Sequence, residues 1–136
     1  MIIGFTGTRR GMTAQQTTSV YNFLEKFDSF IGLHGDCIGA DKDFHGICQN
    51  LNMVIHSRPC ILTSQRAFTN AIIIAEPEKP LDRNKKIVDD STLMLACPGE
   101  FEEVLRSGTW STIRYAKKNK REIYIVFPDG TSEFFK

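Results

Sequence analysis

The sequence predicts a single α/β domain in which a parallel sheet of about five strands is flanked by helices on both faces. Short apolar segments typical of buried strands alternate along the chain with segments whose apolar residues recur every three or four positions. Each pair of successive strand-like segments is separated by enough residues for a helical crossover, which parallel strands require. The length of 136 residues suits one domain, covering residues 1–136.

The first two predicted elements are a buried strand over residues 2–7 and an amphipathic helix over residues 14–27. The strand is largely apolar and carries no charge. The helix places its apolar residues at spacings of three and four, which puts them on one face. These residues are Val20, Phe23, Leu24 and Phe27.

The alternation continues to the end of the chain. Further strands are expected over residues 30–34, 53–56, 92–97 and 122–127. Further helices are expected around Phe44 to Leu51, over residues 82–89 and over residues 108–118, with a turn at 128–131. Residues 57–80 are assigned no structure, because prolines interrupt them and the apolar run at 71–75 fits either a helix or a strand.

Charge and hydropathy exclude several classes of protein. Seventeen basic and sixteen acidic residues give a formal charge of +1, so no strong field directs the chain to nucleic acid or to an anionic membrane. No apolar run approaches the roughly 20 residues that span a bilayer, and no secretory signal precedes the first strand. Four cysteines without a C-x-x-C pair predict reduced packing residues in a cytoplasmic protein, with no zinc site.

Three polar segments each follow a predicted strand and should meet at the carboxyl edge of the sheet, where open parallel sheets bind ligands. The first contains Gly7, Thr8 and Arg9. A glycine allows close approach of the backbone, and hydroxyl and guanidinium groups can donate to phosphate oxygens. An ordinary strand-to-helix turn with a solvated arginine is the alternative.

The second polar segment begins at His34 and contains the carboxylates of Asp36 and Asp41. A carboxylate at the end of a second strand can accept hydrogen bonds from ribose hydroxyls or from a base edge. Asp41 could instead cap the helix that follows. Together with His45 these residues show no recognised metal-ligand spacing, so no metal is expected.

The third polar segment runs from Pro98 to Thr112. Its part Arg106-Ser107-Gly108-Thr109 opens a predicted helix and carries the strongest site signal. It offers free backbone N–H groups, two hydroxyls and the positive end of the helix dipole, which together suit a phosphate. Gly108 is expected to tolerate no side chain, because a β-carbon would block the anion or strain the turn. A simple serine cap would explain Ser107 alone.

Together these segments resemble the SLOG superfamily, a group of Rossmann-like nucleotide-binding proteins that includes LOG-type phosphoribohydrolases and DprA proteins. The resemblance covers nearly the whole chain. It is carried by Gly-Thr-Arg after the first strand, His-Gly-Asp-Cys-x-Gly-Ala-Asp after the second, Leu-Asp-Arg-Asn-Lys before a helix, then Pro-Gly and Ser-Gly-Thr. It implies a Rossmann-like domain in which Arg83, with Asn84 beside it, contacts the phosphate or ribose of the ligand.

The chain departs from the LOG pattern in two places. An acidic segment separates Pro98-Gly99 from Gly108-Thr109, and Thr112, an expected ligand contact, stands where the LOG enzymes carry their catalytic glutamate. The inserted segment supplies Glu100, Glu102 and Glu103, of which Glu102 and Glu103 are the catalytic candidates. A carboxylate near the glycosidic bond could stabilise a ribosyl cation, although these glutamates could equally form a solvated turn.

The sequence leaves two functions open. The chain could bind a nucleotide or ribosyl phosphate and hydrolyse its N-glycosidic bond, or it could sense or sequester a nucleotide-derived signal such as ADP-ribose or a cyclic nucleotide. Thr112 favours the second function, and the glutamates of the inserted segment favour the first. Neither calls for a bound cofactor, and a homo-oligomer, by default a two-fold dimer, is expected. Binding of single-stranded nucleic acid fits poorly with the balanced charge and the missing row of aromatic residues.

Overall fold

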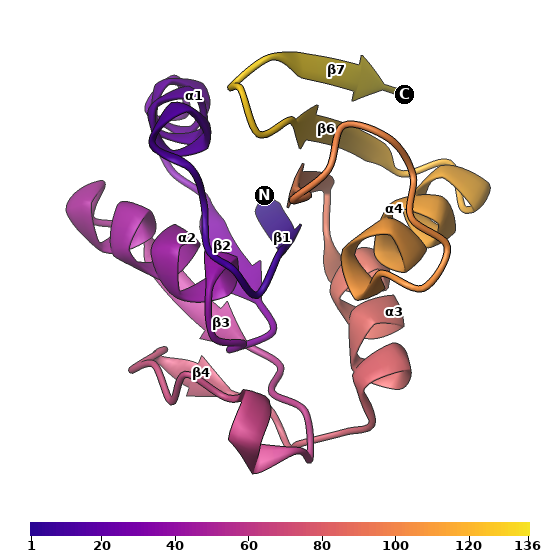
Figure 1. The fold of residues 1–136 in the computed structure, drawn as a ribbon. Coiled ribbons are helices and arrows are strands. Elements are labelled where there is room, and N and C mark those ends of the chain that lie inside the picture. The colour runs from indigo at the N-terminus through magenta and orange to yellow at the C-terminus, as the bar shows by residue number, and fades with distance from the viewer.

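A seven-stranded sheet forms the centre of the computed structural model, which describes all residues from Met1 to Lys136 (Figure 1). The strand order is β4-β3-β2-β1-β5-β6-β7. The strands are β1 (Ile2–Gly7), β2 (Ile31–His34), β3 (Val54–Ser57), β4 (Ile73–Ile74), β5 (Leu93–Cys97), β6 (Glu122–Val126) and β7 (Ser132–Phe135). All neighbours pair in parallel except β6 and β7, which are antiparallel.

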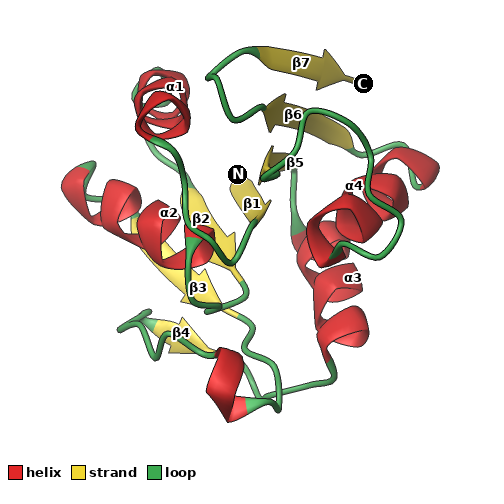
Figure 2. Cartoon of the chain, viewed as in Figure 1, coloured by secondary structure: helices red, strands yellow, loops and turns green.

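The helices cover both faces of the sheet (Figure 2). They are α1 (Ala14–Leu24), α2 (Ala40–Asn50), α3 (Pro80–Asp90) and α4 (Gly108–Lys118), with a short 3₁₀ helix at Thr63–Gln65. Apolar side chains of α1 and α2 join one buried cluster, and those of α3 and α4 join a second cluster. The predicted α/β class with helices on both faces is therefore confirmed.

Strand β5 is the most deeply buried element, because both of its faces meet helices. All five of its residues are buried. Leu95 and Cys97 belong to the cluster beneath α1 and α2, whereas Met94 and Ala96 belong to the cluster beneath α3 and α4. This alternation follows from the two-residue period of a strand, and it explains why the sequence shows a continuous apolar run here.

The strand order reverses around β1, which has β2 on one side and β5 on the other. The chain runs outward from β1 to β4 in one direction, then returns to β5 and continues outward in the other. Loops that leave β1 and β5 therefore separate at the carboxyl edge of the sheet. Such a switch point is where open α/β sheets form a ligand crevice.

The structure differs from the sequence-based expectation chiefly in strands β4 and β7 and in the end of α1. The sheet has seven strands instead of about five, because β4 forms within the unassigned segment 57–80 and β7 follows the turn at 128–131. Helix α1 ends at Leu24, although Phe27 still packs against the core from the turn beyond it. The start of α1 is set by Thr13, whose hydroxyl and backbone form a capping box with Gln16.

None of the helices combines the length and the apolar character needed to cross a bilayer.

Candidate functional site

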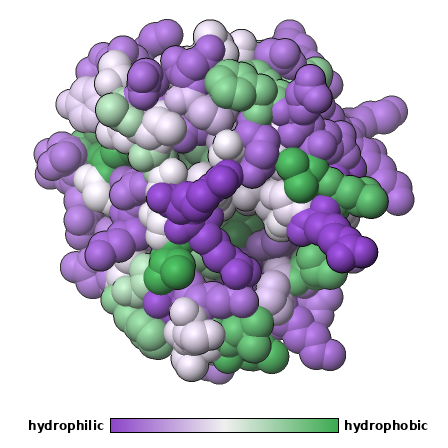
Figure 3. All heavy atoms as spheres, in the orientation of Figure 1, coloured by the Kyte–Doolittle hydropathy of each residue, from purple (hydrophilic) through white to green (hydrophobic).

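A cleft of about 360 Å³ lies at the carboxyl edge of the sheet, over the switch point. The space-filling view shows a hollow near the centre of one face, bordered by strongly hydrophilic atoms (Figure 3). The lining comes from the ends of β1 and β2, the start of α3 and the loop that leads from β5 into α4. The lining residues are Phe5, Thr6, Gly7, Thr8, Arg9, Gly35, Cys37, Asp41, Pro80, Leu81, Arg83, Asn84, Ile87, Gly99, Glu100, Arg106, Ser107, Gly108 and Thr109.

The loop after β1 is held against the start of α2. The backbone N–H of Ala40 donates to the carbonyl of Thr8 at 2.9 Å, and the backbone N–H of Met12 donates to Asp43 at 2.8 Å. Gly39 caps α2 at φ +88°, and a β-carbon there would collide with the backbone of Arg9. This close contact presents Thr8 and Arg9 at the cleft wall. The predicted site residue Gly7 also lines the cleft, yet its missing β-carbon mainly makes room for Ala40.

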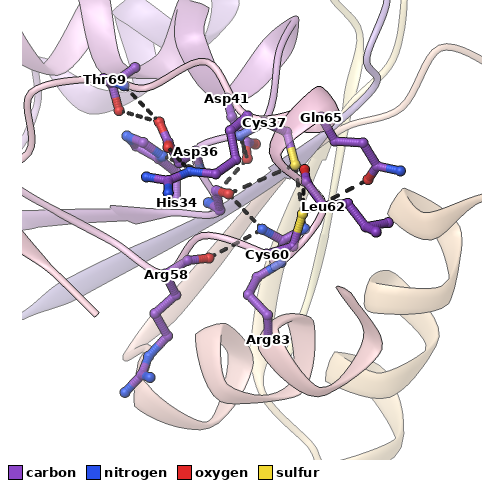
Figure 4. Close-up of polar contacts among 12 residues, drawn as sticks. His34, Asp36, Cys37, Asp41, Arg58, Cys60, Leu62, Gln65, Thr69 and Arg83 are labelled. Atoms are coloured by element: carbon purple, nitrogen blue, oxygen red, sulfur yellow. Dashed lines mark hydrogen bonds and ion pairs between the residues drawn. The ribbon is translucent and has the colours of Figure 1, made fainter. Parts of the chain in front are cut away.

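Arg83 projects from α3 beneath the loop that follows β2, toward Cys37 and Asp41 (Figure 4). Its guanidinium group donates to the carbonyl of Gly35, to the carbonyl of Arg58 at 3.1 Å, and to Cys37 Sγ at 3.3 Å. Its Nε donates to Asn84 Oδ1 at 2.8 Å. Arg83 is 5% exposed, so it is a buried cation in the cleft wall.

Asp41 is a buried carboxylate next to this cation. It accepts hydrogen bonds from the backbone N–H groups of Gly35 at 3.0 Å and Cys37 at 3.1 Å. Burial raises its pKa to about 6, against the opposing effects of the Arg83 charge and the two N–H donors. The cleft therefore has a carboxyl group that changes its charge close to neutral pH.

The start of α4 forms the opposite wall. Ser107 caps the helix by accepting a hydrogen bond from the backbone N–H of Trp110 at 3.2 Å. The backbone N–H groups of Gly108 and Thr109 donate to no other group of the protein. Arg106, just before the cap, is exposed and makes no ion pair or hydrogen bond. Donors and a free cation thus converge on this wall.

The expectation that Gly108 would be strained by a side chain is wrong. A β-carbon on Gly108 would meet no atom within 4 Å, and the residue lies in the first turn of a helix with no left-handed backbone angle. Its β-carbon position faces open space beside the cleft. Only a ligand, and not the fold, could require glycine here.

Of the three glutamates in the inserted segment, Glu100 alone lines the cleft. Its carboxylate accepts hydrogen bonds from Arg10 at 2.7 Å and from the indole nitrogen of Trp110 at 2.9 Å. Glu103 is paired with Arg114 at 2.6 Å, and Glu102 is exposed outside the lining. The two catalytic candidates, Glu102 and Glu103, are therefore not brought to the cleft in this structure.

His34 and Asp36 lie behind the cleft wall and are fully buried. The backbone N–H of Asp36 donates to His34 Nδ1 at 2.8 Å, which leaves the His34 proton on Nε2, where it faces His45 Nδ1 at 2.9 Å. Burial, together with the charge of His45, lowers the pKa of His34 to about 3. His34 is consequently a neutral structural residue at neutral pH.

Asp36 attaches the segment 66–69 to the loop after β2. Its carboxylate accepts from Arg66 at 3.0 Å and from both the backbone N–H and the hydroxyl of Thr69, at 2.8 and 2.7 Å. Although burial opposes the charged form, these hydrogen bonds outweigh it and lower the pKa of Asp36. Thr112 is also buried, and its hydroxyl donates to the carbonyl of Gly108 at 2.9 Å. These residues shape the site from outside its lining.

Sequence reasoning left several lining residues out, and two of them present side-chain groups that a ligand could contact. Cys37 was expected to be a packing residue, as Cys48 and Cys97 are, but it is half-buried in the cleft wall, where burial and nearby Asp41 raise its pKa to about 11. Leu81 lines the cleft and is exposed, so it offers apolar surface to a ligand. The signal for Cys37 was its place just beyond the end of a buried strand, the same signal that pointed to Asp36.

Comparisons with known proteins identify solved structures with a similar fold. No family model and no curated protein matches the chain. The chain is similar to the solved structure of a molybdenum cofactor binding protein from the phototrophic bacterium Rippkaea orientalis, with a TM-score of 0.72 and 18% identity over 93% of this chain and 76% of the other. It is also similar to DNA processing protein A from Helicobacter pylori, which is described as having a unique single-stranded DNA binding mode, with a TM-score of 0.59 and 17% identity over 92% of this chain and 64% of the other.

Proposed function

The chain has the fold of the SLOG superfamily, as its motifs predicted, and from this premise we propose that its cleft binds a nucleotide or a related ribosyl phosphate without cleaving it. The observation that carries the proposal is the convergence of Arg9, Arg83, Arg106 and the open start of α4 on one cleft. Backbone donors at a helix start and guanidinium groups are the partners that phosphate oxygens prefer. A cytoplasmic location, where nucleotides are abundant, is part of the proposal.

The balance of charge in the cleft supports an anionic ligand. Three arginines line it, against the two carboxylates Asp41 and Glu100. Glu100 is already paired with Arg10, and the raised pKa of Asp41 makes its negative charge easy to remove. Among the three arginines, Arg106 makes no hydrogen bond or ion pair within the protein, so all its donors are available to a ligand.

Binding without cleavage is favoured because the cleft has few groups for glycosidic chemistry. Thr112, at the position of the LOG glutamate, can supply no charge and donates its hydroxyl to the helix backbone. A sensing or sequestering role therefore accounts for the residues better than hydrolysis does. A likeness to a protein described as binding a cofactor agrees with this role.

The test is a thermal-shift panel that compares nucleoside monophosphates, ADP-ribose and cyclic nucleotides with the matched nucleosides. A ligand that binds the native state raises the melting temperature by mass action, so the phosphate-bearing compounds should raise it and the nucleosides should raise it much less. Arg106→Ala should reduce the shift while leaving the melting temperature of the free protein unchanged. Equal shifts from nucleotides and nucleosides would overturn the proposal.

Hydrolysis is the second candidate, and Glu100 is the observation that keeps it open. It is a carboxylate in the cleft wall, held by two N–H donors. Long incubation with nucleoside monophosphates, NAD and ADP-ribose, followed by chromatography, would detect a released base. Release that Glu100→Gln abolishes, with binding retained, would assign the protein to the hydrolases.

A similarity to a DNA-binding protein is in tension with the near-zero net charge of this chain. Single-stranded DNA that shares the cleft would compete with the nucleotide. A short single-stranded oligonucleotide belongs in the same panel, with its binding followed at two salt concentrations. Salt-sensitive binding that is stronger than that of every nucleotide would favour the DNA-binding role.

A further inference from the structure

We propose that two copies of this chain associate through the β4 edge of the sheet, which makes a two-fold symmetric dimer with one continuous sheet. The proposal does not depend on what the cleft binds, because β4 and the cleft lining share no residue. It rests on the exposure, charge and shape of the surface around β4.

The β4 edge is open and apolar. Strand β4 lies at the end of the strand order, so one side of its backbone has no strand partner (Figure 1). Ile72, Ile73 and Ile74 are 74%, 55% and 51% exposed. Because successive side chains of a strand point to opposite faces, apolar surface is exposed on both faces of the sheet at this edge. Ile72 lies just before the strand, and Ile73 and Ile74 form it. Single exposed apolar residues are common, but three consecutive ones at a free sheet edge are not.

The two edges of the sheet differ in charge. Residues 67–75, which contain β4, carry no charged side chain. The other edge strand, β7, contains Glu133 and is followed by Lys136. Charged side chains on an edge strand discourage pairing with another chain, and only β7 has this protection.

A shallow groove continues the apolar surface beside β4. It has a volume of about 280 Å³. None of its seven lining residues is charged; they are Gln49, Asn52, Met53, Val54, Ile55, Asn70 and Ile72. Val54 on the neighbouring strand β3 is also exposed. The surface available to a partner is therefore wider than the two-residue strand alone.

The absence of charge points to a second copy of the chain as the occupant. In a two-fold interface the same patch lies on both partners, so any charge near the axis would meet its own like charge. A neutral patch avoids this repulsion, whereas a partner of another kind could be matched by a complementary charge.

The proposal places the two-fold axis at Ile73, the middle one of the three exposed isoleucines. Antiparallel strands related by a two-fold axis at Ile73 place Ile73 opposite Ile73 of the partner subunit, and Ile72 opposite the partner's Ile74. Residues directly opposite in an antiparallel pair have β-carbons about 5 Å apart. Ile73 is therefore the position where one substitution changes both sides of the centre.

The test is the mass in solution, measured by size-exclusion chromatography with light scattering. The wild-type chain is expected at twice its 15.4 kDa mass, and Ile73→Lys at the mass of one chain. Phe134→Lys, a matched change of an exposed apolar residue on β7, should remain a dimer. Circular dichroism checks that both variants are folded.

A cross-link provides a second measurement. Under mild oxidation by dioxygen, two Ile73→Cys side chains should lose their two hydrogens to the oxidant and form a disulfide between copies. The equivalent Phe134→Cys variant should not, which also controls for the four native thiols. A monomeric wild-type chain at the highest soluble concentrations would overturn the proposal, and so would a dimer that survives Ile73→Lys or fails to cross-link through Ile73→Cys.

Discussion

Arg83 stabilises the loop after β2 with the same guanidinium group that it presents to the cleft. Its donors satisfy the carbonyls of Gly35 and Arg58, and a β-carbon on Gly35 would collide with it. An arginine on the surface could be removed without effect on the fold, but Arg83 is buried. Its two roles should therefore be lost together.

We expect Arg83→Ala to lower the free energy of unfolding by about 2–3 kcal/mol, because buried carbonyls lose charged donors. The same variant should lose the melting-temperature shift given by nucleoside monophosphates. Urea titration and the thermal-shift panel measure the two effects. Arg106→Ala is the matched control, since Arg106 has no partner in the protein and should affect the ligand alone. An Arg83→Ala protein as stable as the wild type would contradict the buried role.

Asp41 and His34 titrate with opposite effects on stability. The pKa of His34 is lowered to about 3, so the unfolded chain binds this proton more tightly and stability falls as the pH drops below about 6.5. The pKa of Asp41 is raised to about 6, so the folded chain binds this proton more tightly and stability rises as the pH drops from about 6 toward 4. The His34 shift is the larger of the two and should decide the sign.

We expect these two groups to make the free energy of unfolding lower at pH 5 than at pH 7. From the pKa shifts, protonation of His34 in the unfolded chain lowers the free energy of unfolding by about 2 kcal/mol between pH 7 and pH 5. Protonation of Asp41 in the folded chain raises it by about 1 kcal/mol over the same interval. Asp41→Asn should remove the compensating contribution and steepen the loss by about 1 kcal/mol. Urea titrations of both proteins at the two pH values test this, and equal slopes would show that Asp41 has an ordinary pKa.

At the scale of the element, a substitution in the first turn of α4 should have different effects on the stability of the fold and on the affinity for the ligand. Gly108→Ala should leave stability unchanged or raise it by about 0.5 kcal/mol, because alanine is the better helix former and its β-carbon meets open space. The same methyl group would stand where a phosphate approaches the helix start, so nucleotide affinity should fall.

Gly46→Ala on α2 is the control for this change. Gly46 is also helical, its β-carbon would also meet no atom within 4 Å, and it lies outside the cleft lining. It should gain stability without any change in affinity. Isothermal titration of both variants measures the difference, and equal affinities would move the phosphate away from α4.

At the scale of the whole molecule, the buried cysteines report on how cooperatively the domain opens. Cys48 lies on α2 and Cys97 on β5, and both belong to the core cluster beneath α1 and α2. Burial raises the pKa of Cys48 to about 12 and raises that of Cys97 further. Neither thiol can form a reactive thiolate in the folded state at neutral pH.

We expect Cys48 and Cys97 to react with a disulfide reagent at one common rate, because the opening that exposes one should expose both. Peptide mass spectrometry of samples quenched over time measures each rate. Half-buried Cys37 should react sooner, and a bound nucleotide should slow all three. Different rates for Cys48 and Cys97 would mean that α2 detaches from the sheet before the domain unfolds.

Local sequence determined most of the fold, because the apolar period of each segment and the short-range caps act within a few residues. The helix over residues 108–118 was predicted at its observed bounds, since Ser107 caps it and basic residues end it. Strand β4 could not be predicted from the sequence, because the apolar run at 71–75 suits either a helix or a strand. Pairing with β3 in the folded protein decides between the two. Strand β7, which pairs with β6 only after a turn, depended on the same kind of partner.

The sequence alone also placed the polar loops at one edge of the sheet, because parallel strands share the direction of their ends. Only the tertiary structure decided which side chains reach the cleft. Asp36 lies in the loop after β2 and Asp41 lies five residues later in the first turn of α2, yet Asp36 turns away to hold Arg66 and Thr69 while Asp41 lines the cleft. The direction of a side chain in a loop depends on partners about 30 residues away in the sequence, and those partners become neighbours only when the sheet has formed.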